Sequence, residues 1–296
     1  MYPTETRVAQ KLQGTIEKEL SRLGLLFRVF SRAKSENSIN EKINKSPGKY
    51  SADGKKIQDL FGVRVALYFP EDVLVSQQVI SNLFKLIEET VDDIENSSFS
   101  AVRCNYVYEL PDELISESAA LKKNNLIDAT FEIQFRTVLS EGWHEVEHDL
   151  RYKCSDDWVG QNDLDRALNG IYASLETSDW GMTKVFDELA YRHYKEKNWG
   201  AMLRNKFRLR TGNGLKESVC ALLNEDNGLG KKLYRAERSN VLKKIASTKI
   251  SMPINLNNLV FLINHFFIKS PELIKLTPQP ILQSLNEYYP VKVSTK

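Results

Sequence analysis

A chain of 296 residues is long enough to bury one large core or two modest ones, so it does not depend on disulfides to fold. Its 42% hydrophobic and 27% charged residues are ordinary for a globular protein, and the net charge of +2 is too small to indicate a partner. The three cysteines are odd in number and lack metal-ligand spacing, which favours a reducing compartment. We find no apolar N-terminal run and no apolar stretch of membrane-spanning length, so we expect a cytoplasmic protein that does not enter a membrane.

The first half of the chain alternates β-prone runs with segments whose apolar residues recur at helical spacing. Strands are predicted at 26–33, 62–69, 104–110 and 127–136. Helices are predicted at 5–23, at 36–45, from Pro70 to about Glu89, and at 138–151. Gly24 should end the first helix, and the polar stretch 46–56 reads as a loop.

From about residue 160 the pattern becomes purely helical. Helices are predicted at 163–178, 181–197, 199–209, 214–223, 229–247 and 256–268. We therefore expect an α/β (α+β) domain over 1–155, with a mixed β-sheet flanked by helices, followed by an all-helical C-terminal domain over 156–296.

One predicted strand carries an unusual polar face. Alternate side chains of a strand share a face, so Glu132, Gln134 and Arg136 of FEIQFRT point one way. Three polar groups of both charge signs are typical of a hydrated site rather than of a core. Asp59 precedes the strand that contains Arg64, and we expect Asp59 to meet Glu132 across adjacent strands. Two carboxylates in one pocket suit Mg²⁺, which prefers oxygen ligands.

Basic residues precede these acids in the chain. Arg32, Lys34 and Lys42 lie in the stretch RAKSENSINEK. Guanidinium and ammonium groups beside a carboxylate-bound metal indicate a polyphosphate ligand. Taken singly, each charge is better explained as a solvated side chain or a surface ion pair, but their gathering at strand edges favours a site.

Three blocks of the sequence together resemble the RelA/SpoT synthetase family. They are RAKSENSINEK, DLFGVRV at 59–65, and EIQFRT followed by WHEVEHDLRYK at 143–153. The family's pattern reads R-x-K-S-x-x-S-I-x-x-K, D-x-x-G-x-R, and E-I-Q-x-R-T with W-x-x-x-E-H-x-x-x-Y-K. The third block is the most specific. The resemblance covers about residues 5–155 and implies a nucleotidyltransferase-like synthetase domain in a small, single-function member.

This resemblance implies that the β,γ-pyrophosphate of ATP moves to a ribose 3′-hydroxyl of a guanine or adenine nucleotide, with release of AMP. It implies Asp59 and Glu132 as the catalytic residues that bind Mg²⁺. The residues implied to bind ATP are Arg32, Lys34, Lys42 and Arg64. Those implied to line the acceptor side are Gln134, Arg136, His148 and Lys153.

One family element is missing. Members that make ppGpp carry a G-Y-x-S-x-H element whose tyrosine stacks on the acceptor guanine, and an ungapped comparison lays it over SFSAVR. Phe99 then replaces the tyrosine and Arg103 the histidine. An aromatic face for the acceptor is retained while the hydroxyl and imidazole are lost, so guanine as the acceptor base stays open.

The helical half is strongly basic. Residues 192–249 hold fifteen Lys and Arg against five Asp and Glu, including MLRNKFRLR at 202–210. Basic groups interleaved with aromatics can bind a nucleic acid, although they are also consistent with solvated helix faces. Three functions therefore stay open: alarmone synthesis, pyrophosphorylation of the 3′ end of tRNA by a toxin with an antitoxin partner or in phage defence, and nucleotide sensing by a degenerate, non-catalytic module.

Overall fold

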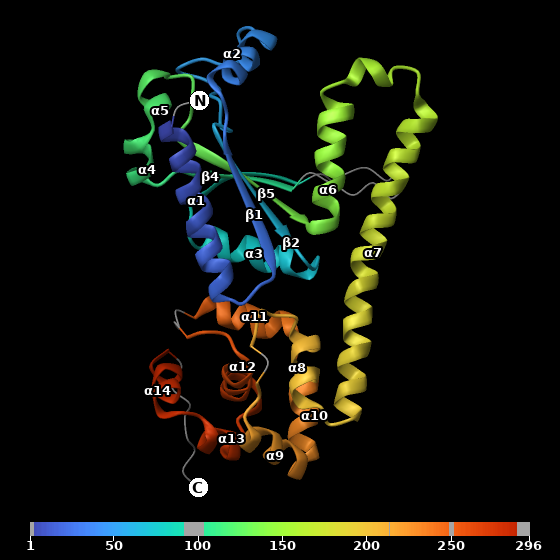
Figure 1. Ribbon diagram of the computed structural model, residues 1–296. Helices are drawn as coiled ribbons and strands as arrows, with labels where there is room; N and C mark the ends of the chain where they lie inside the picture. The colour runs from blue at the N-terminus through green and yellow to red at the C-terminus, as the bar shows by residue number, and fades with distance from the viewer. Residues whose placement is uncertain (1–2, 92–103, 213, 249–251, 289–296) are drawn as a thin grey trace. The chain divides into compact units, whose positions relative to one another are not determined.

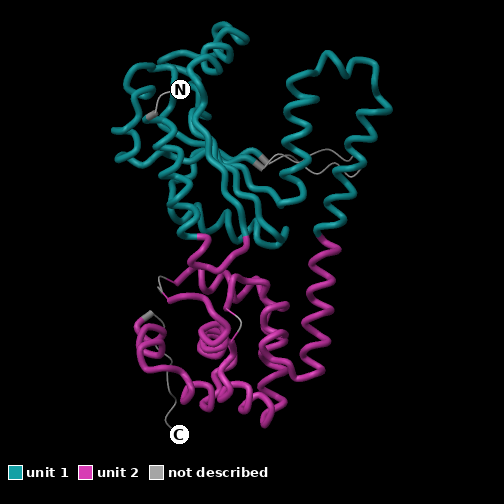
Figure 2. The backbone as a smooth tube through the Cα atoms, viewed as in Figure 1, with its two compact units in different colours: residues 1–19, 27–179 teal, residues 20–26, 180–296 magenta. Residues whose placement is uncertain are grey.

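The computed structural model describes residues 3–91, 104–212, 214–248 and 252–288. The chain divides into two compact units, Met1–Glu19 with Phe27–Asp179 and Leu20–Leu26 with Trp180–Lys296 (Figure 2). The division falls inside a long helix, whereas the change in sequence character predicted a domain boundary near residue 155. That boundary, as a limit between independently folding domains, stays a prediction.

A mixed β-sheet forms the centre of the first unit (Figure 1). Its strands are β1 (Phe27–Ala33), β2 (Phe61–Leu67), β3 (Leu86–Val91), β4 (Cys104–Glu109) and β5 (Thr130–Thr137), in the spatial order β1-β2-β5-β4-β3. Strands β2 and β5 run parallel, and the other neighbouring pairs run antiparallel. The predicted class, a mixed sheet flanked by helices, is confirmed.

The helices of this part of the chain are α1 (Pro3–Arg22), α2 (Glu36–Lys45), α3 (Glu71–Ser81), α4 (Asp112–Glu117), α5 (Ala119–Lys123), α6 (Val138–Glu147), the π-helix η1 (His148–Tyr152), the 3₁₀-helix η2 (Ser155–Trp158) and α7 (Asn162–Lys195). Local signals set some of these limits. The Ser35 side chain caps α2 by accepting a hydrogen bond from the Ser38 N–H at 3.2 Å. After α1, Gly24 adopts a φ of +72°, which continues no right-handed helix.

The predicted helix from Pro70 to Glu89 was wrong in its second half. Helix α3 ends at Ser81, and the chain then turns and enters β3. At the turn, Phe84 is buried with its ring 5.0 Å from that of Phe131, in a T-shaped arrangement. Leu86 pairs with Tyr108 on β4. Aromatic burial and strand pairing, both contacts with residues distant in sequence, therefore override the local helical pattern.

Two other helix predictions also needed correction. The predicted helix 138–151 changes at Glu147 into the π-helical turn η1, and the predicted helices 163–178 and 181–197 are the single helix α7. Thr177 and Ser178 do not break α7, because their hydroxyls donate to the carbonyls of Ala173 and Ser174 one turn earlier.

The described part of the second unit is helical, as predicted. Beyond the end of α7 it contains α8 (Trp199–Phe207), α9 (Glu217–Glu225), α10 (Asn227–Arg235), α11 (Arg238–Ser247), α12 (Leu256–Ile263), the π-helix η3 (Asn264–Ile268), α13 (Pro271–Leu276) and α14 (Gln279–Tyr288). The predicted helix 229–247 is split into α10 and α11, because Ala236 and Glu237 adopt extended backbone angles. None of the helices in the described ranges has the length and apolarity needed to cross a membrane.

Strand β5 shows the predicted alternation of faces. Phe131, Ile133 and Phe135 are buried, while Glu132, Gln134 and Arg136 are half-buried on the opposite face. The apolar side chains thus anchor the strand in the core and fix its register, because a slip of one residue would exchange the two faces. The polar row is thereby presented to the functional site.

Candidate active site

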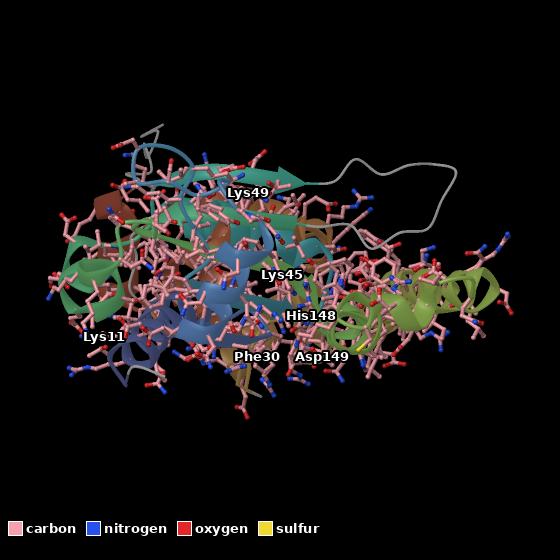
Figure 3. The ribbon with its side chains drawn as sticks, turned by 90° about the horizontal axis from the view of Figure 1, so that it is seen from above. Lys11, Phe30, Lys45, Lys49, His148 and Asp149 are labelled. Carbon is pink, nitrogen blue, oxygen red and sulfur yellow. The ribbon has the colours of Figure 1, made fainter. Side chains whose placement is uncertain are left out.

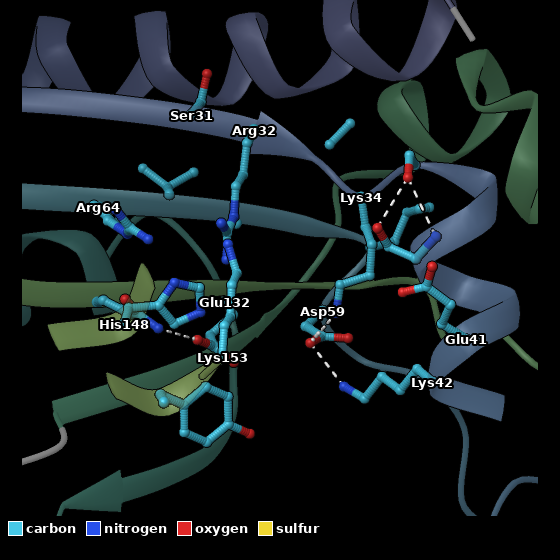
Figure 4. A pocket seen from close by; sticks show the side chains of 18 of the residues that line it. Ser31, Arg32, Lys34, Glu41, Lys42, Asp59, Arg64, Glu132, His148 and Lys153 are labelled. Atoms are coloured by element: carbon cyan, nitrogen blue, oxygen red, sulfur yellow. Dashed lines mark hydrogen bonds and ion pairs between the residues drawn. The ribbon is translucent and has the colours of Figure 1, made fainter. Parts of the chain in front are cut away.

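A pocket of about 770 Å³ opens on the polar face of the sheet in the first unit (Figure 4). It is lined by residues of β1, β2, β5, α2, η1 and the segments that adjoin them. Its lining includes seven lysine and arginine residues but only three carboxylates, so the pocket is suited to an anionic ligand. The carboxylates are Glu41, Asp59 and Glu132.

Asp59 lies at the centre of a tight charged cluster. Lys34 donates to Asp59 Oδ2 at 2.6 Å and Lys42 donates to the same oxygen at 2.7 Å. Burial acts to raise the pKa of Asp59, but the two lysines outweigh it, so the pKa of this carboxyl lies below its usual value. Asp59 Oδ1 is buried and has no hydrogen-bond partner among the described residues. One oxygen of the acid is thus left for a ligand.

The pKa values of the two lysines that pair with Asp59 shift in opposite directions. Burial outweighs the attraction of Asp59 at Lys34, and the pKa of Lys34 is lowered. At Lys42 burial also acts to lower the pKa, but Asp59, Tyr50 and Glu132 together outweigh it, and the pKa is raised. Lys34 is the less exposed of the two side chains, which accounts for its larger loss of hydration. The field of Glu132 therefore reaches the Asp59 cluster.

A chain of hydrogen bonds holds Glu132. Gln134 Nε2 donates to Glu132 Oε1 at 2.6 Å, and Gln134 Oε1 accepts from Arg136 Nη2 at 2.9 Å. Arg136 also pairs with Glu141 of α6 at 2.9 Å, and Glu141 pairs with Arg64 of β2 at 3.2 Å. The polar row of β5 is thus locked to the following helix.

The π-helical turn η1 brings a further group of residues to the pocket. The Lys153 N–H donates to the His148 carbonyl at 3.1 Å, five residues back, which is the wide turn of a π-helix. His148, Tyr152 and Lys153 all line the pocket, and the rings of His148 and Tyr152 stack at 5.7 Å. Arg151 stabilises this turn through an ion pair with Asp165 of α7, with 2.8 Å between Arg151 Nη1 and Asp165 Oδ1. Figure 3 shows His148 on η1 and Lys45 on α2 seen from above.

The structure brings nine of the predicted site residues into this pocket: Arg32, Lys34, Lys42, Asp59, Arg64, Glu132, Gln134, His148 and Lys153. Arg136 does not line the pocket but contacts Gln134. Arg64, implied to bind ATP, lines the pocket and also forms ion pairs with Glu141 and Glu145. Phe99 and Arg103 lie outside the described residues. The roles assigned to all of these residues stay predictions.

Sequence reasoning missed several pocket residues: Phe30, Glu41, Lys45, Lys49, Tyr50 and Tyr152. Two signals were available. Lys45 follows Lys42 by three residues on a helix, so both side chains lie on one face. Phe30 alternates with Arg28 and Arg32 on a strand, so it shares their face.

The basic run of the second unit is partly internal. Arg208 is buried and pairs with Asp187 at 2.7 Å, and Arg238 is buried and donates to the Phe207 carbonyl at 2.7 Å. Because these two side chains are buried and stabilise the helical core, they do not contribute to the surface. The basic surface of this unit is therefore smaller than the number of Lys and Arg residues in its sequence indicated. Exposed cations of this unit include Lys231, Lys232 and Arg235 on α10.

The fold and the pocket define an α/β domain with a cation-lined site on the polar face of a mixed sheet. Residues 31–157, less than half of the chain, match the family model described as "Region found in RelA / SpoT proteins". A comparison of the sequence with curated proteins finds no match.

Similar solved structures cover much the same share of the chain. Small alarmone synthetase 1 from Bacillus subtilis is 18% identical with a TM-score of 0.49, and the match covers 62% of this chain and 92% of that chain. Small alarmone synthetase 2 from the same organism is 21% identical with a TM-score of 0.46, over 62% and 96%. The protein smu.1046c from Streptococcus mutans is 24% identical with a TM-score of 0.48, over 63% and 94%.

Proposed function

We propose that the first unit transfers the β,γ-pyrophosphate of ATP to the ribose 3′-hydroxyl of a guanine or adenine nucleotide and releases AMP. The match to RelA/SpoT proteins over residues 31–157 supports alarmone synthesis at the level of the family. The observation that carries the proposal for this chain is one pocket that holds Asp59, Glu132 and a surplus of cations.

Cations that are not already paired support a polyphosphate ligand. Arg32, Lys45 and Lys49 line the pocket and form no ion pair with any described residue. Guanidinium and ammonium groups bind phosphate oxygens by charge-assisted hydrogen bonds. Arg32 would supply a planar donor next to the Asp59 cluster, while Lys45 and Lys49 would supply point charges at α2 and the loop that follows it.

The acids of the pocket fit a magnesium ion. Asp59 offers its buried, unpartnered Oδ1, and Glu132 offers a second carboxylate. Within the described ranges no group of three or more His, Cys, Asp and Glu residues converges as metal ligands, so a Mg²⁺ ion would take its other ligands from water and phosphate. When bound, it would neutralise charge that develops on the phosphates.

Glu132 is proposed to accept the proton of the attacking 3′-hydroxyl. The oxygen then bonds to the β-phosphorus, the bond to the α–β bridging oxygen breaks, and AMP leaves with that oxygen. Gln134 would orient the Glu132 carboxylate through its 2.6 Å hydrogen bond. Lys34 and Lys42 would hold the phosphates in line for attack, and positioning with charge neutralisation supplies most of the acceleration in such transfers.

The test compares Glu132→Gln with wild type, using γ-labelled ATP and Mg²⁺. GDP, GTP, AMP, ADP and tRNA are offered separately, and the labelled product names the acceptor. The variant should keep its thermal unfolding profile and lose transfer by orders of magnitude. Glu88→Gln, an exposed acid of β3 outside the pocket, should retain activity. Transfer by Glu132→Gln at the wild-type rate would sink the mechanism; ATP binding by wild type without any turnover would favour a nucleotide-sensing module.

A second candidate acceptor, the 3′ end of tRNA, is favoured by an aromatic cluster in the second unit. The rings of Tyr194 and Tyr234 stack at 4.7 Å, Tyr191 lies 6.1 Å from Tyr234, and the Lys206 ammonium lies 5.6 Å from the centre of the Tyr234 ring. Aromatic side chains with cations can bind single-stranded nucleic acid, and within this cluster Tyr191 is exposed while Tyr194 and Tyr234 are half-buried. On this alternative the protein is a toxin, held in check by an antitoxin protein.

The tRNA alternative is tested by charge reversal at exposed positions. Lys231→Glu combined with Lys232→Glu on α10 should abolish transfer to tRNA and spare transfer to free nucleotides. Equal activity of the double variant and wild type toward tRNA would remove this alternative. The buried Arg208 is unsuited to the test, because its replacement would disturb the helical core.

A further inference from the structure

Helix α7 carries a line of apolar side chains that lies open to solvent. The helix is one continuous element of 34 residues, Asn162–Lys195 (Figure 1). One face of it is covered, since Tyr172 is buried with its ring 4.8 Å from that of Trp143. The described residues leave a neighbouring face uncovered, and we call that face the exposed stripe. Its members are Leu164, Ile171, Ser178, Met182, Val185 and Leu189.

The exposed stripe follows a seven-residue period. Its residues belong to two series in the sequence: Leu164, Ile171, Ser178 and Val185, each seven residues apart, and Leu168, Leu175, Met182 and Leu189, which lie four residues after them. Ile171 is 54% exposed and Val185 is 64% exposed. Apolar residues at alternating spacings of four and three form the seam of a coiled coil. A single exposed apolar side chain needs no explanation, but a seam of this period fits a second helix.

The exposed stripe has a polar residue at its centre. Ser178 lies at the middle of α7, because it is sixteen residues from Asn162 and seventeen from Lys195. Its hydroxyl donates to the Ser174 carbonyl at 2.7 Å and so has a hydrogen-bond partner within the helix. A copy of α7 that runs antiparallel about Ser178 overlaps the whole helix and sets Ile171 against Val185. The contact is then self-complementary, as a two-fold axis requires.

The charges at the two ends of α7 favour the antiparallel orientation. The first turn carries Asp163 and Asp165, and the last turn carries Arg192, His193 and Lys195. Antiparallel pairing brings the acids of one copy beside the basic residues of the other. Parallel pairing would set like charges side by side, which weakens association. The charge pattern therefore identifies the partner helix as a second copy of α7.

We propose that α7 is a dimerisation helix, through which two copies of this chain pair antiparallel about Ser178 along the exposed stripe. The period of the stripe, its polar centre and the opposite charges at its ends all match α7 itself. This inference goes beyond the proposed function and needs no nucleotide, so it stands or falls independently of pyrophosphate transfer.

Sedimentation of the full chain tests the pairing. Wild type at micromolar concentration should sediment with twice the mass of one chain. Ile171→Glu combined with Val185→Glu sets like charges against each other and should raise the dissociation constant about 100-fold or more. Ile171→Glu combined with Val185→Lys sets opposite charges against each other in the antiparallel register and should remain dimeric. Leu74→Glu, at a 70% exposed position of α3, is the matched control and should also remain dimeric.

Cross-linking tests the register. Ser178→Cys should form a disulfide between two copies under mild oxidation, because residue 178 meets itself at the two-fold axis. Ile171→Cys should not link to itself, since the two copies of this residue lie about 21 Å apart along the helices. A mixture of Ile171→Cys and Val185→Cys should link. The wild-type chain, with its own three cysteines, gives the background.

Several results would overturn the inference. A monomeric wild type would reject the dimer, including one that associates only with a different protein. A dimer that survives Ile171→Glu with Val185→Glu would place the contact elsewhere. Loss of the dimer in the Glu–Lys variant, self-linking of Ile171→Cys, or no linking of Ser178→Cys would reject the antiparallel register.

Discussion

Glu141 joins two arginines that come from different strands. Its Oε2 accepts from Arg136 Nη1 at 2.9 Å and its Oε1 from Arg64 Nη1 at 3.2 Å. Glu141 is buried on α6, while Arg136 lies on β5 and Arg64 on β2. Since Arg136 also donates to Gln134, and Gln134 to Glu132, the helix that follows β5 helps to position the proposed catalytic acid.

Replacing Glu141 by Gln should destabilise the protein by about 3 kcal/mol, because two partly buried guanidinium groups lose their shared carboxylate. Chemical denaturation measures this change. The control is Glu145→Gln, on the same helix and paired with the same Arg64, but with a side chain that is 50% exposed. Removing this exposed partner should cost less than about 1 kcal/mol. Equal effects of the two variants would contradict the view that burial gives Glu141 its importance.

His144 should make the protein less stable as the pH falls. Burial, together with the charges of Arg136 and Arg64, lowers the pKa of His144 to about 3. The unfolded chain, with a histidine pKa of about 6.5, then binds a proton more readily than the folded protein at any pH between these values. Stability is lost as the pH falls below about 6.5, by about 2 kcal/mol at pH 5. Denaturation of wild type and His144→Gln at pH 7.5 and pH 5 checks this, and the variant should show a smaller loss.

Asp59 should contribute stability at neutral pH that disappears in acid. Its folded pKa is lowered, because Lys34 and Lys42 outweigh burial, so its contribution is present above the unfolded pKa of about 3.9 and is lost as the pH falls through the folded value. Asp59→Asn should therefore be less stable than wild type at pH 7, and the difference should shrink toward pH 3. Asp156→Asn, at an exposed acid of η2, should differ little from wild type at either pH. A difference for Asp59→Asn that does not depend on pH would refute the charge-based account.

Arg208 should prove structural and not a ligand-binding residue. It ends α8 in the left-handed conformation with a φ of 48°, its side chain is 4% exposed, and it pairs with Asp187. Arg208→Glu would place a buried carboxylate against that acid and should destabilise the second unit by about 3 kcal/mol or more. Arg235→Glu, on the exposed surface of α10, should leave the thermal unfolding of the protein nearly unchanged. Thermal denaturation compares the two.

Local patterns in the sequence determined much of the first unit. The period of two in FEIQFRT predicted which residues of β5 face the core, because strand geometry forces that alternation. Gly24 marked the stop after α1. Arg32, Lys34 and Asp59 lie in blocks of sequence that resemble the RelA/SpoT pattern. They indicated a phosphate site, because binding a polyphosphate with its metal ion needs cations and a carboxylate close together.

Only the tertiary structure decided the features that depend on contacts between distant residues. Strand β3 exists because β4 supplies its hydrogen-bond partners, and the burial of Arg208 depends on Asp187 from another helix. The same holds for the pocket itself. The acid at Glu141 and the ring at Phe30 look unremarkable in the sequence, because only the packing of α6 and the register of β1 against β2 bring them to Arg64.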